Sequence, residues 1–187
     1  MEYEISALAD HPKHAAAVAA RTYQMWGRLI YEDTGMSASE FTEVIRKRAV
    51  KDQVPLTLIA LAGDKLVGTV GLKKEETSTT AGLSPWIGGL LVDEAWRSKG
   101  IGAALLAAAE VSAARLGFSW LYLSCEPDLE PFYGRLGWES MQRTVSCGDE
   151  VMLMRKPLAP VAIANRSRPG ADSRAGLQSD ELIEEPS

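Results

Sequence analysis

Apolar and polar residues follow a helical period in two early parts of the chain. Val18, Thr22 and Leu29 recur at helical spacing within residues 11–30, which predicts an amphipathic helix there. The segment from Ser37 to Glu40 has the form S-x-x-E, in which the two side chains satisfy each other's free backbone donors at a helix start. A second helix is therefore expected over residues 37–50.

Short apolar runs bounded by turn residues predict the strands. These runs cover residues 3–8, 55–61, 66–72, 86–92, 120–123, 138–145 and 151–155, and two more helices are expected at 100–116 and 131–136. The helical crossover between residues 92 and 120 requires a parallel strand pair, whereas the short turns elsewhere require antiparallel pairs. The pattern therefore predicts an α+β domain with a mixed sheet.

The periodic pattern ends near residue 157. The following sequence, ANRSRPGADSRAGLQSDELIEEPS, is rich in Ser, Pro, Gly and charged residues, a composition typical of segments that do not pack. We expect one domain over residues 1–157 and a disordered tail over 158–187.

Composition narrows the functional classes. The chain has 187 residues, of which 46% are hydrophobic, and its N-terminus MEYEISALAD is acidic, so a signal peptide, a membrane span and an extracytoplasmic location are not expected. Two cysteines and two histidines provide neither a disulfide framework nor a metal site. The net charge of −5 disfavours nucleic acid as a partner and is compatible with a cationic one.

The stretch RSKGIGAA at residues 97–104 indicates a binding site. Glycine is costly inside a helix, yet Gly100 and Gly102 stand where a helix begins. A helix N-terminus with accessible amides and nearby cations binds phosphate groups well. Leu105 occupies the third glycine position of the dinucleotide fingerprint, and the P-loop pattern is absent. Tight packing of the helix on a strand is the structural alternative.

Several segments in order make the pattern more specific. The pattern R-x-x-G-x-G follows a strand valine, and FYGRLGW comes after the next strand. Residues 85–141 closely, and 3–156 more loosely, resemble the GCN5-related N-acetyltransferase (GNAT) family. The resemblance implies a mostly antiparallel sheet with one parallel, splayed strand pair and helices on both faces.

The resemblance also implies acetyl-CoA as cosubstrate. Its pyrophosphate would contact Arg97, Ser98, Lys99, Gly100, Ile101, Gly102 and Ala103. Its pantetheine arm and acetyl group would bind the backbone of Leu90, Leu91 and Val92. Two glycines inside a strand, Gly88 and Gly89, independently suggest a bulge, or they relieve crowding by a neighbouring tryptophan.

The candidate catalytic residues are Tyr133 and Glu126. Tyr133 resembles the family tyrosine that protonates the departing thiolate, although it could simply pack against its aromatic neighbours. Glu126 is the first candidate for the base, followed by Glu75, Glu76 or a chain of water molecules. Cys125 lacks a plausible histidine partner, which argues against a covalent intermediate.

The resemblance therefore implies an N-acetyltransferase that acts by direct transfer to a primary amine, either a small molecule or a peptide. The acidic residues Glu32, Asp33, Glu75, Glu76 and Glu126 suggest that the amine is cationic before it reacts. A catalytically idle acyl-CoA-binding module is the second interpretation. Whether the protein forms a homodimer stays open.

Overall fold

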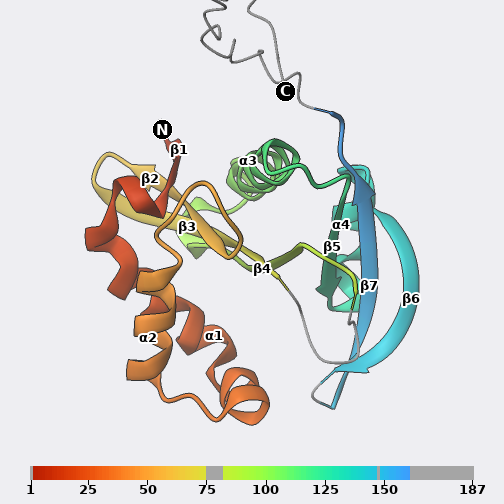
Figure 1. The fold of residues 1–187 in the computed structure, drawn as a ribbon, viewed down its shortest axis with the longest axis horizontal. Coiled ribbons are helices and arrows are strands. Elements are labelled where there is room, and N and C mark those ends of the chain that lie inside the picture. Colours follow the sequence, from red (N-terminus) through yellow and green to blue (C-terminus); the bar gives the residue numbers. More distant parts are fainter. Residues whose placement is uncertain (1, 75–81, 147, 161–187) are drawn as a thin grey trace, which may run out of the picture.

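The computed structural model describes residues 2–74, 82–146 and 148–160. Its core is one seven-stranded sheet with the strand order β1-β2-β3-β4-β5-β7-β6 (Figure 1). The strands are β1 (Glu4–Ala7), β2 (Leu56–Ala62), β3 (Lys65–Lys73), β4 (Trp86–Val92), β5 (Trp120–Cys125), β6 (Glu139–Ser146) and β7 (Asp149–Pro157). All neighbours pair antiparallel except β4 and β5, so the predicted mixed sheet with one parallel pair is confirmed.

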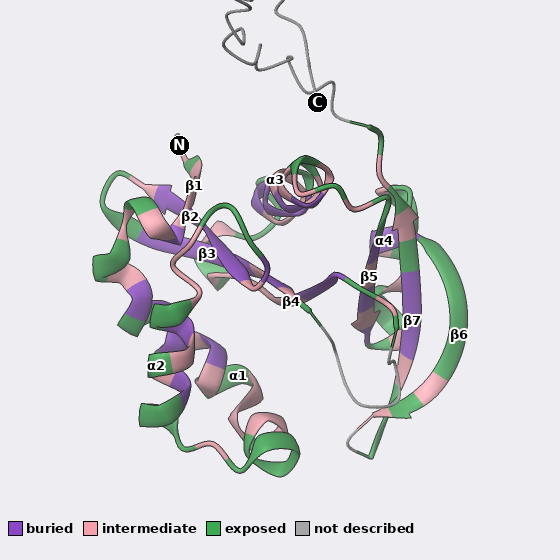
Figure 2. Ribbon diagram, viewed as in Figure 1, coloured by how far each residue is buried: buried purple, intermediate pink, exposed green. Residues whose placement is uncertain are grey.

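The helices cover both faces of this sheet, as expected. They are α1 (Ala15–Thr34), α2 (Ala38–Lys47), α3 (Ile101–Arg115) and α4 (Glu130–Arg135). Residues of β2 alternate between two cores: Leu56 and Leu58 pack in the cluster that includes α3, whereas Ile59 and Leu61 pack in the cluster that includes α1 and α2. The central strands β2 and β3 are accordingly mostly buried, whereas the edge strand β6 is mostly exposed (Figure 2).

The parallel pair β4–β5 makes little contact. Trp86 and Tyr122 are its registered partners, and the Tyr122 N–H donates to the Pro85 carbonyl at 3.1 Å. Beyond Trp86 the backbones of the two strands diverge toward their carboxyl ends, and this divergence is called the opening below (Figure 1). Among residues 2–74, 82–146 and 148–160, the rest of β4 pairs only with β3.

A bulge interrupts β4 next to this opening. Gly88 pairs with Gly71 and Leu91 with Thr69, so Gly89 and Leu90 together lie opposite a single residue, and Gly89 has a φ of +64°. A Cβ on Gly88 would lie 2.3 Å from Lys73 Cε. The side chain that crowds Gly88 is therefore Lys73 and not a tryptophan.

The structure changes the expected ends of two helices. α1 continues past residue 30 to Thr34 because its stop is Gly35, which has a φ of +70°. α2 begins with the predicted capping box of Ser37 and Glu40 but ends at Lys47. Its last carbonyls turn toward β2, where Thr57 N–H donates to the Arg48 carbonyl at 3.1 Å.

The domain includes at least one residue of the predicted tail. Leu158 packs against the main core, and its N–H donates to the Ser119 carbonyl at 2.9 Å. Residues 161–187, where most of the tail prediction falls, lie outside the described residues.

Candidate functional site

A cavity of about 340 Å³ opens at the start of α3. It lies between β4, the loop that follows β4, the first turn of α3, and α4. The lining is mainly apolar. It includes nine residues that the sequence indicated, namely Leu90, Val92, Arg97, Ser98, Gly100, Ile101, Gly102, Ala103 and Tyr133, and three more, namely Trp96, Leu129 and Phe132. The predicted loop and the predicted tyrosine thus share one cavity.

The first turn of α3 presents backbone donors to this cavity. Gly100 is the N-cap with a φ of +80°, and no side chain caps the helix. The first helical hydrogen bond runs from Ala104 N–H to the Gly100 carbonyl at 2.9 Å, so the N–H groups of residues 101–103 have no acceptor within the helix. They carry the positive end of the helix dipole, which suits an anion.

The two glycines of this turn have different physical roles. Gly100 needs the left-handed backbone, which side-chain-bearing residues avoid. Gly102 is helical, and a Cβ there would lie 3.8 Å from Phe132 Cζ and 3.9 Å from Val92 Cγ2, which are ordinary contacts. Because both neighbours line the cavity, this Cβ would point into it. Close packing does not require glycine at position 102, so the glycine leaves space beside the helix for an occupant of the cavity.

The two cations of the loop are also placed differently. Arg97 lines the cavity, and its Nε donates to the Val92 carbonyl at 3.2 Å. Lys99 Nζ donates to the Ala95 carbonyl at 2.7 Å and lies 4.8 Å from the centre of the Trp96 ring. Lys99 is not among the residues lining the cavity, and its contacts with Ala95 and Trp96 stabilise the loop instead. The predicted residue Leu91 does not line the cavity either.

Ser98 is the second left-handed residue of this loop, with a φ of +60°. A residue with a Cβ pays a steric cost of about 1 kcal/mol in this conformation. Backbone strain of this kind is frequent at binding loops. The sequence alone gave no signal for it.

Tyr133 lies in the cavity wall on α4. Only 7% of it is exposed, and its ring makes edge contacts with Phe132 and Trp138, at centroid distances of 5.0 and 6.2 Å. Burial, with a smaller contribution from the nearby Cys125, raises the pKa of Tyr133 to about 12. Its hydroxyl therefore keeps its proton at neutral pH.

Cys125 ends β5 and is buried, with its Sγ 3.9 Å from Met154 Sδ. Burial, with smaller contributions from the charges of Glu130 and Glu126, raises the pKa of this thiol to about 11. Nucleophilic cysteines are thiolates with lowered pKa values. This environment therefore agrees with the expectation that Cys125 forms no covalent intermediate.

The first candidate base is not in the cavity wall. Glu126 is exposed at the start of the turn before α4 and is not among the lining residues. Glu75 and Glu76 lie outside the described residues.

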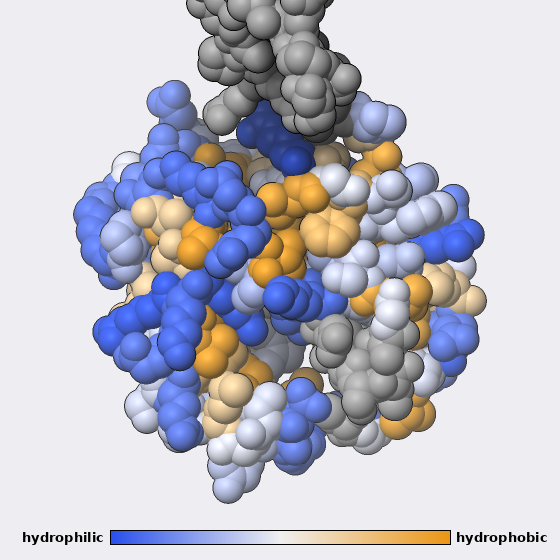
Figure 3. All heavy atoms as spheres, viewed as in Figure 1, coloured by the Kyte–Doolittle hydropathy of each residue, from blue (hydrophilic) through white to orange (hydrophobic). Residues whose placement is uncertain are grey.

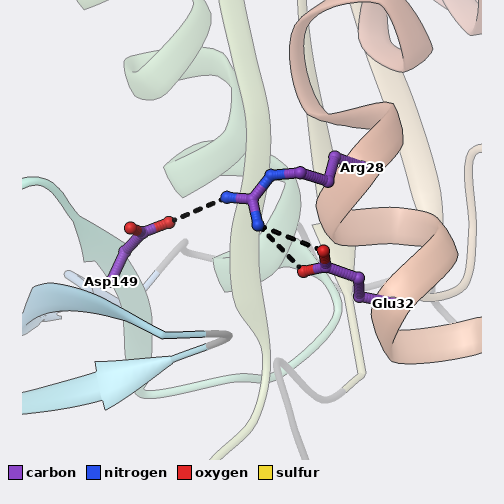
Figure 4. Close-up of polar contacts among 3 residues, drawn as sticks. All are labelled: Arg28, Glu32 and Asp149. Atoms are coloured by element: carbon purple, nitrogen blue, oxygen red, sulfur yellow. Dashed lines mark hydrogen bonds and ion pairs between the residues drawn. The ribbon is translucent and has the colours of Figure 1, made fainter.

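Charged side chains join the two sides of the opening on the α1 face. Arg28 on α1 contacts both Glu32 oxygens at 3.1 Å and Asp149 of β7 at 3.4 Å (Figure 4). In the space-filling view, apolar side chains show as separate patches between hydrophilic ones (Figure 3). The contact between Arg28 and Asp149 links residues 121 positions apart, which sequence patterns could not reveal.

Two classes of site are not found in the part of the chain that the structure describes. No group of three or more His, Cys, Asp or Glu side chains is arranged to hold a metal ion there. No helix in residues 2–74, 82–146 or 148–160 is both long enough and apolar enough to cross a bilayer.

Comparison with known proteins agrees with the family resemblance seen in the sequence. Residues 22–138 match the model of the acetyltransferase (GNAT) family. No curated protein sequence matches the chain. Solved structures do match the chain, and three of them are described next.

A GNAT-family acetyltransferase from Streptococcus pneumoniae is 19% identical, with a TM-score of 0.61 over 84% of this chain and 100% of its own. An aminoglycoside 6'-N-acetyltransferase in complex with coenzyme A is 16% identical, with a TM-score of 0.65 over 84% and 98%. A protein from Lactobacillus plantarum assigned as an N-acetyltransferase is 26% identical, with a TM-score of 0.60 over 85% and 100%.

Proposed function

Because the chain belongs to the GNAT acetyltransferase family, we propose that it transfers an acetyl group from acetyl-CoA to a primary amine by direct transfer in a ternary complex. The observation that carries the proposal is the cavity at the start of α3, which brings the glycine-containing turn and Tyr133 together. We place this reaction in the cytoplasm, as the sequence suggests.

The first turn of α3 fits the pyrophosphate of acetyl-CoA. The unpaired N–H groups of residues 101–103 and the open space beside Gly102 supply donors and room. Arg97 adds a positive charge on the rim, and Ser98 and Gly100 shape the loop. Lys99 contributes by holding the loop at Ala95 and Trp96.

The bulged part of β4 fits the pantetheine arm. Beyond Trp86, β4 has no registered partner on the β5 side among the described residues. We therefore propose that backbone groups of Leu90, Leu91 and Val92 bind an extended ligand, apart from the Val92 carbonyl, which accepts from Arg97 Nε. One strand N–H there would stabilise the oxyanion that develops on the thioester carbonyl.

The chemistry needs one proton acceptor and one proton donor. The amine nitrogen attacks the thioester carbonyl, and the C–S bond then breaks. We assign Tyr133 as the acid that gives its hydroxyl proton to the thiolate of CoA. Its buried position keeps it protonated. Glu126, Glu75, Glu76 or water takes the proton from the amine.

The acceptor is proposed to be cationic before it reacts. Asp33 and Glu126 are exposed carboxylates, and an ammonium must lose a proton before it attacks. Glu32 is less available than the sequence suggests because Arg28 binds both of its oxygens. One structural neighbour is an aminoglycoside acetyltransferase, so aminoglycosides join small amines and peptides as candidates.

A panel of amines tests this proposal. Kanamycin, spermidine and a lysine-containing peptide are each incubated with acetyl-CoA, and free thiol release is followed. We expect at least one to accelerate CoA release well above hydrolysis. Tight acetyl-CoA binding without acceleration by any amine would favour the idle module, which the family match does not support.

A further inference from the structure

Lys156 of β7 lies on the face of the sheet that α3 and α4 cover. It is in register with Leu121 of β5, which is buried in the main core, and residues directly opposite on paired strands share a face. The preceding residue, Arg155, lies on the other face, where its Nε donates to Glu139 at 3.1 Å. The Lys156 side chain is 21% exposed. β7 thus directs a long cationic side chain toward the two helices that border the cavity.

The ammonium group of Lys156 joins these two helices. It donates to Glu110 Oε1 at 2.7 Å and Oε2 at 2.8 Å, in the second half of α3, and to the Leu136 carbonyl at 2.7 Å, directly after α4. An ammonium group has three N–H donors, so these contacts use all of them. Glu110 is 20% exposed, and salt screens a partly buried pair only weakly. We call Lys156 and Glu110 the clamp, because together they hold the end of α4 against α3.

The turn that closes α4 is shaped to receive this lysine. Gly137 has a left-handed φ of +84°, and a Cβ there would lie 3.6 Å from Lys156 Cε, so the lysine stem packs directly on the turn. A carbonyl at the end of a helix has no partner within the helix. Lys156 supplies that partner to Leu136.

α4 depends on such contacts because it is short. It has six residues, of which only Tyr133 is buried, and a helix of this length is not stable alone in water. At its start, Ser140 Oγ donates to Glu130 Oε1 at 2.5 Å, and at its end Lys156 binds Leu136. Tyr133 lies between these two attachments, and its carbonyl accepts from Leu136 N–H at 2.9 Å. The end that Lys156 holds is therefore bonded directly to the backbone of Tyr133.

We propose that Lys156, through its pair with Glu110, is a positioning residue for Tyr133. The helices that the clamp joins form two sides of the cavity, one at the first turn of α3 and one at Tyr133. Without the contact of Lys156 with Leu136, α4 would shift and the Tyr133 hydroxyl would lose its fixed place beside the departing sulfur. This role rests on the proposed function of Tyr133 as the acid. The pyrophosphate turn precedes Glu110 by about two turns of α3, so acetyl-CoA binding should not depend on the clamp.

A variant that removes both charges tests the clamp without leaving a buried charge unpaired. Removal of one partner of a buried ion pair is strongly destabilising, whereas replacement of both by apolar residues of similar volume is often tolerated. The clamp variant therefore combines Glu110→Leu with Lys156→Met, and thermal melting checks that it folds. The single variant Glu110→Gln keeps the shape of the side chain and weakens the pair, so it should show the same changes to a smaller extent.

Amide hydrogen exchange on the full chain follows α4 without any acceptor. The N–H groups of residues 136–138 donate to carbonyls of Tyr133 and Gly134, so their exchange reports how firmly the end of α4 is held. In the clamp variant, exchange at residues 136–138 should be about twofold to tenfold faster, the effect of one lost hydrogen bond. Exchange at residues 101–106 should stay unchanged.

The kinetic test uses the amine that proves active. The clamp variant should lower kcat by about tenfold to 100-fold, the size of effect that a small misplacement of a reacting group produces, and leave KM for acetyl-CoA within about twofold. In a Tyr133→Phe background the clamp variant should lower kcat no further, because the hydroxyl that the clamp positions is absent. A purely structural role would give the same loss in both backgrounds.

Arg155→Met is the matched control, since it removes a cation of the same strand on the opposite face. It should change neither kcat nor exchange at residues 136–138. Unchanged exchange in the clamp variant would overturn the hold on α4. Faster exchange with unchanged kcat, or an equal loss of kcat in the Tyr133→Phe background, would overturn the positioning role. The exchange measurement needs no acceptor, so a failure of the amine panel bears on the proposed function and not on the clamp.

Discussion

Replacing Tyr133 with phenylalanine separates its chemistry from its packing. The change removes one oxygen and keeps the ring, whose edge contacts with Phe132 and Trp138 do not involve the hydroxyl. If the hydroxyl protonates the thiolate, kcat should fall by about 10²–10⁴-fold, the usual contribution of general acid catalysis. This loss corresponds to about 3–5 kcal/mol in the activation barrier.

The raised pKa of Tyr133 adds a signature in the pH dependence. With a pKa of about 12, the hydroxyl stays protonated from neutral pH to about pH 10. The ratio of activity between the unmodified protein and Tyr133→Phe should therefore be constant over this range. A tyrosine of ordinary pKa, about 10, would make the ratio shrink from about pH 9 upward.

The assay follows thiol release with the amine that proves active, beside calorimetry with acetyl-CoA and thermal melting. Tyr122→Phe is the control, since it removes a hydroxyl from another aromatic pair, with Trp86 at 5.5 Å. Full activity in Tyr133→Phe would remove Tyr133 from the catalytic residues. Activity that falls only in proportion to stability would show that the residue acts through packing.

Three other predictions concern the loop, the buried thiol and the tail. Gly102→Val should weaken acetyl-CoA binding by at least about 100-fold in calorimetry, because its branched side chain enters the cavity. Gly102→Ala should raise the free energy of unfolding by up to about 1 kcal/mol and keep most of its affinity for acetyl-CoA. Equal affinity in a folded Gly102→Val would refute the loop assignment. Burial raises the pKa of Cys125 from 9.0 to about 11, so the unfolded state loses this proton first and stability should fall between about pH 9 and 11; Cys125→Ala should make that alkaline loss shallower in denaturant titrations, and an identical slope would contradict the shift. A chain ending at residue 160 should melt and bind acetyl-CoA as the full chain does, and melting many degrees lower would show that the tail contributes to the fold.

The features that sequence predicted best are those fixed by neighbouring residues. The capping box at Ser37 is a local exchange of hydrogen bonds, and it formed as expected. The strand at residues 86–92 was predicted with its observed bounds, because an apolar run between turn residues has little alternative. The loop at Arg97 and the tyrosine at 133 share one cavity, as the family resemblance implied.

The features that sequence missed depend on contacts between distant parts of the chain. The end of α2 at Lys47 lies next to β2, and the non-helical backbone of Trp26 inside α1 leaves no trace in the helical period. Trp96, Leu129 and Phe132 line the cavity because the loop and α4 meet there. Lys99 looks like a phosphate ligand until its bond to the Ala95 carbonyl is seen.

The position of β7 between β5 and β6 determines the order in which the molecule can assemble during synthesis. Strands β1–β4 and α3 lie within residues 4–115 and can pair as the chain emerges, since domains form from the N-terminal side first. β5 and β6 cannot pair with each other and must wait for β7, at Asp149–Pro157, which pairs with both. Until then each is an open edge that can pair with another chain. β7 therefore completes the β5 side of the sheet, so a nascent chain cannot form this half of the molecule until residues 149–157 have been made.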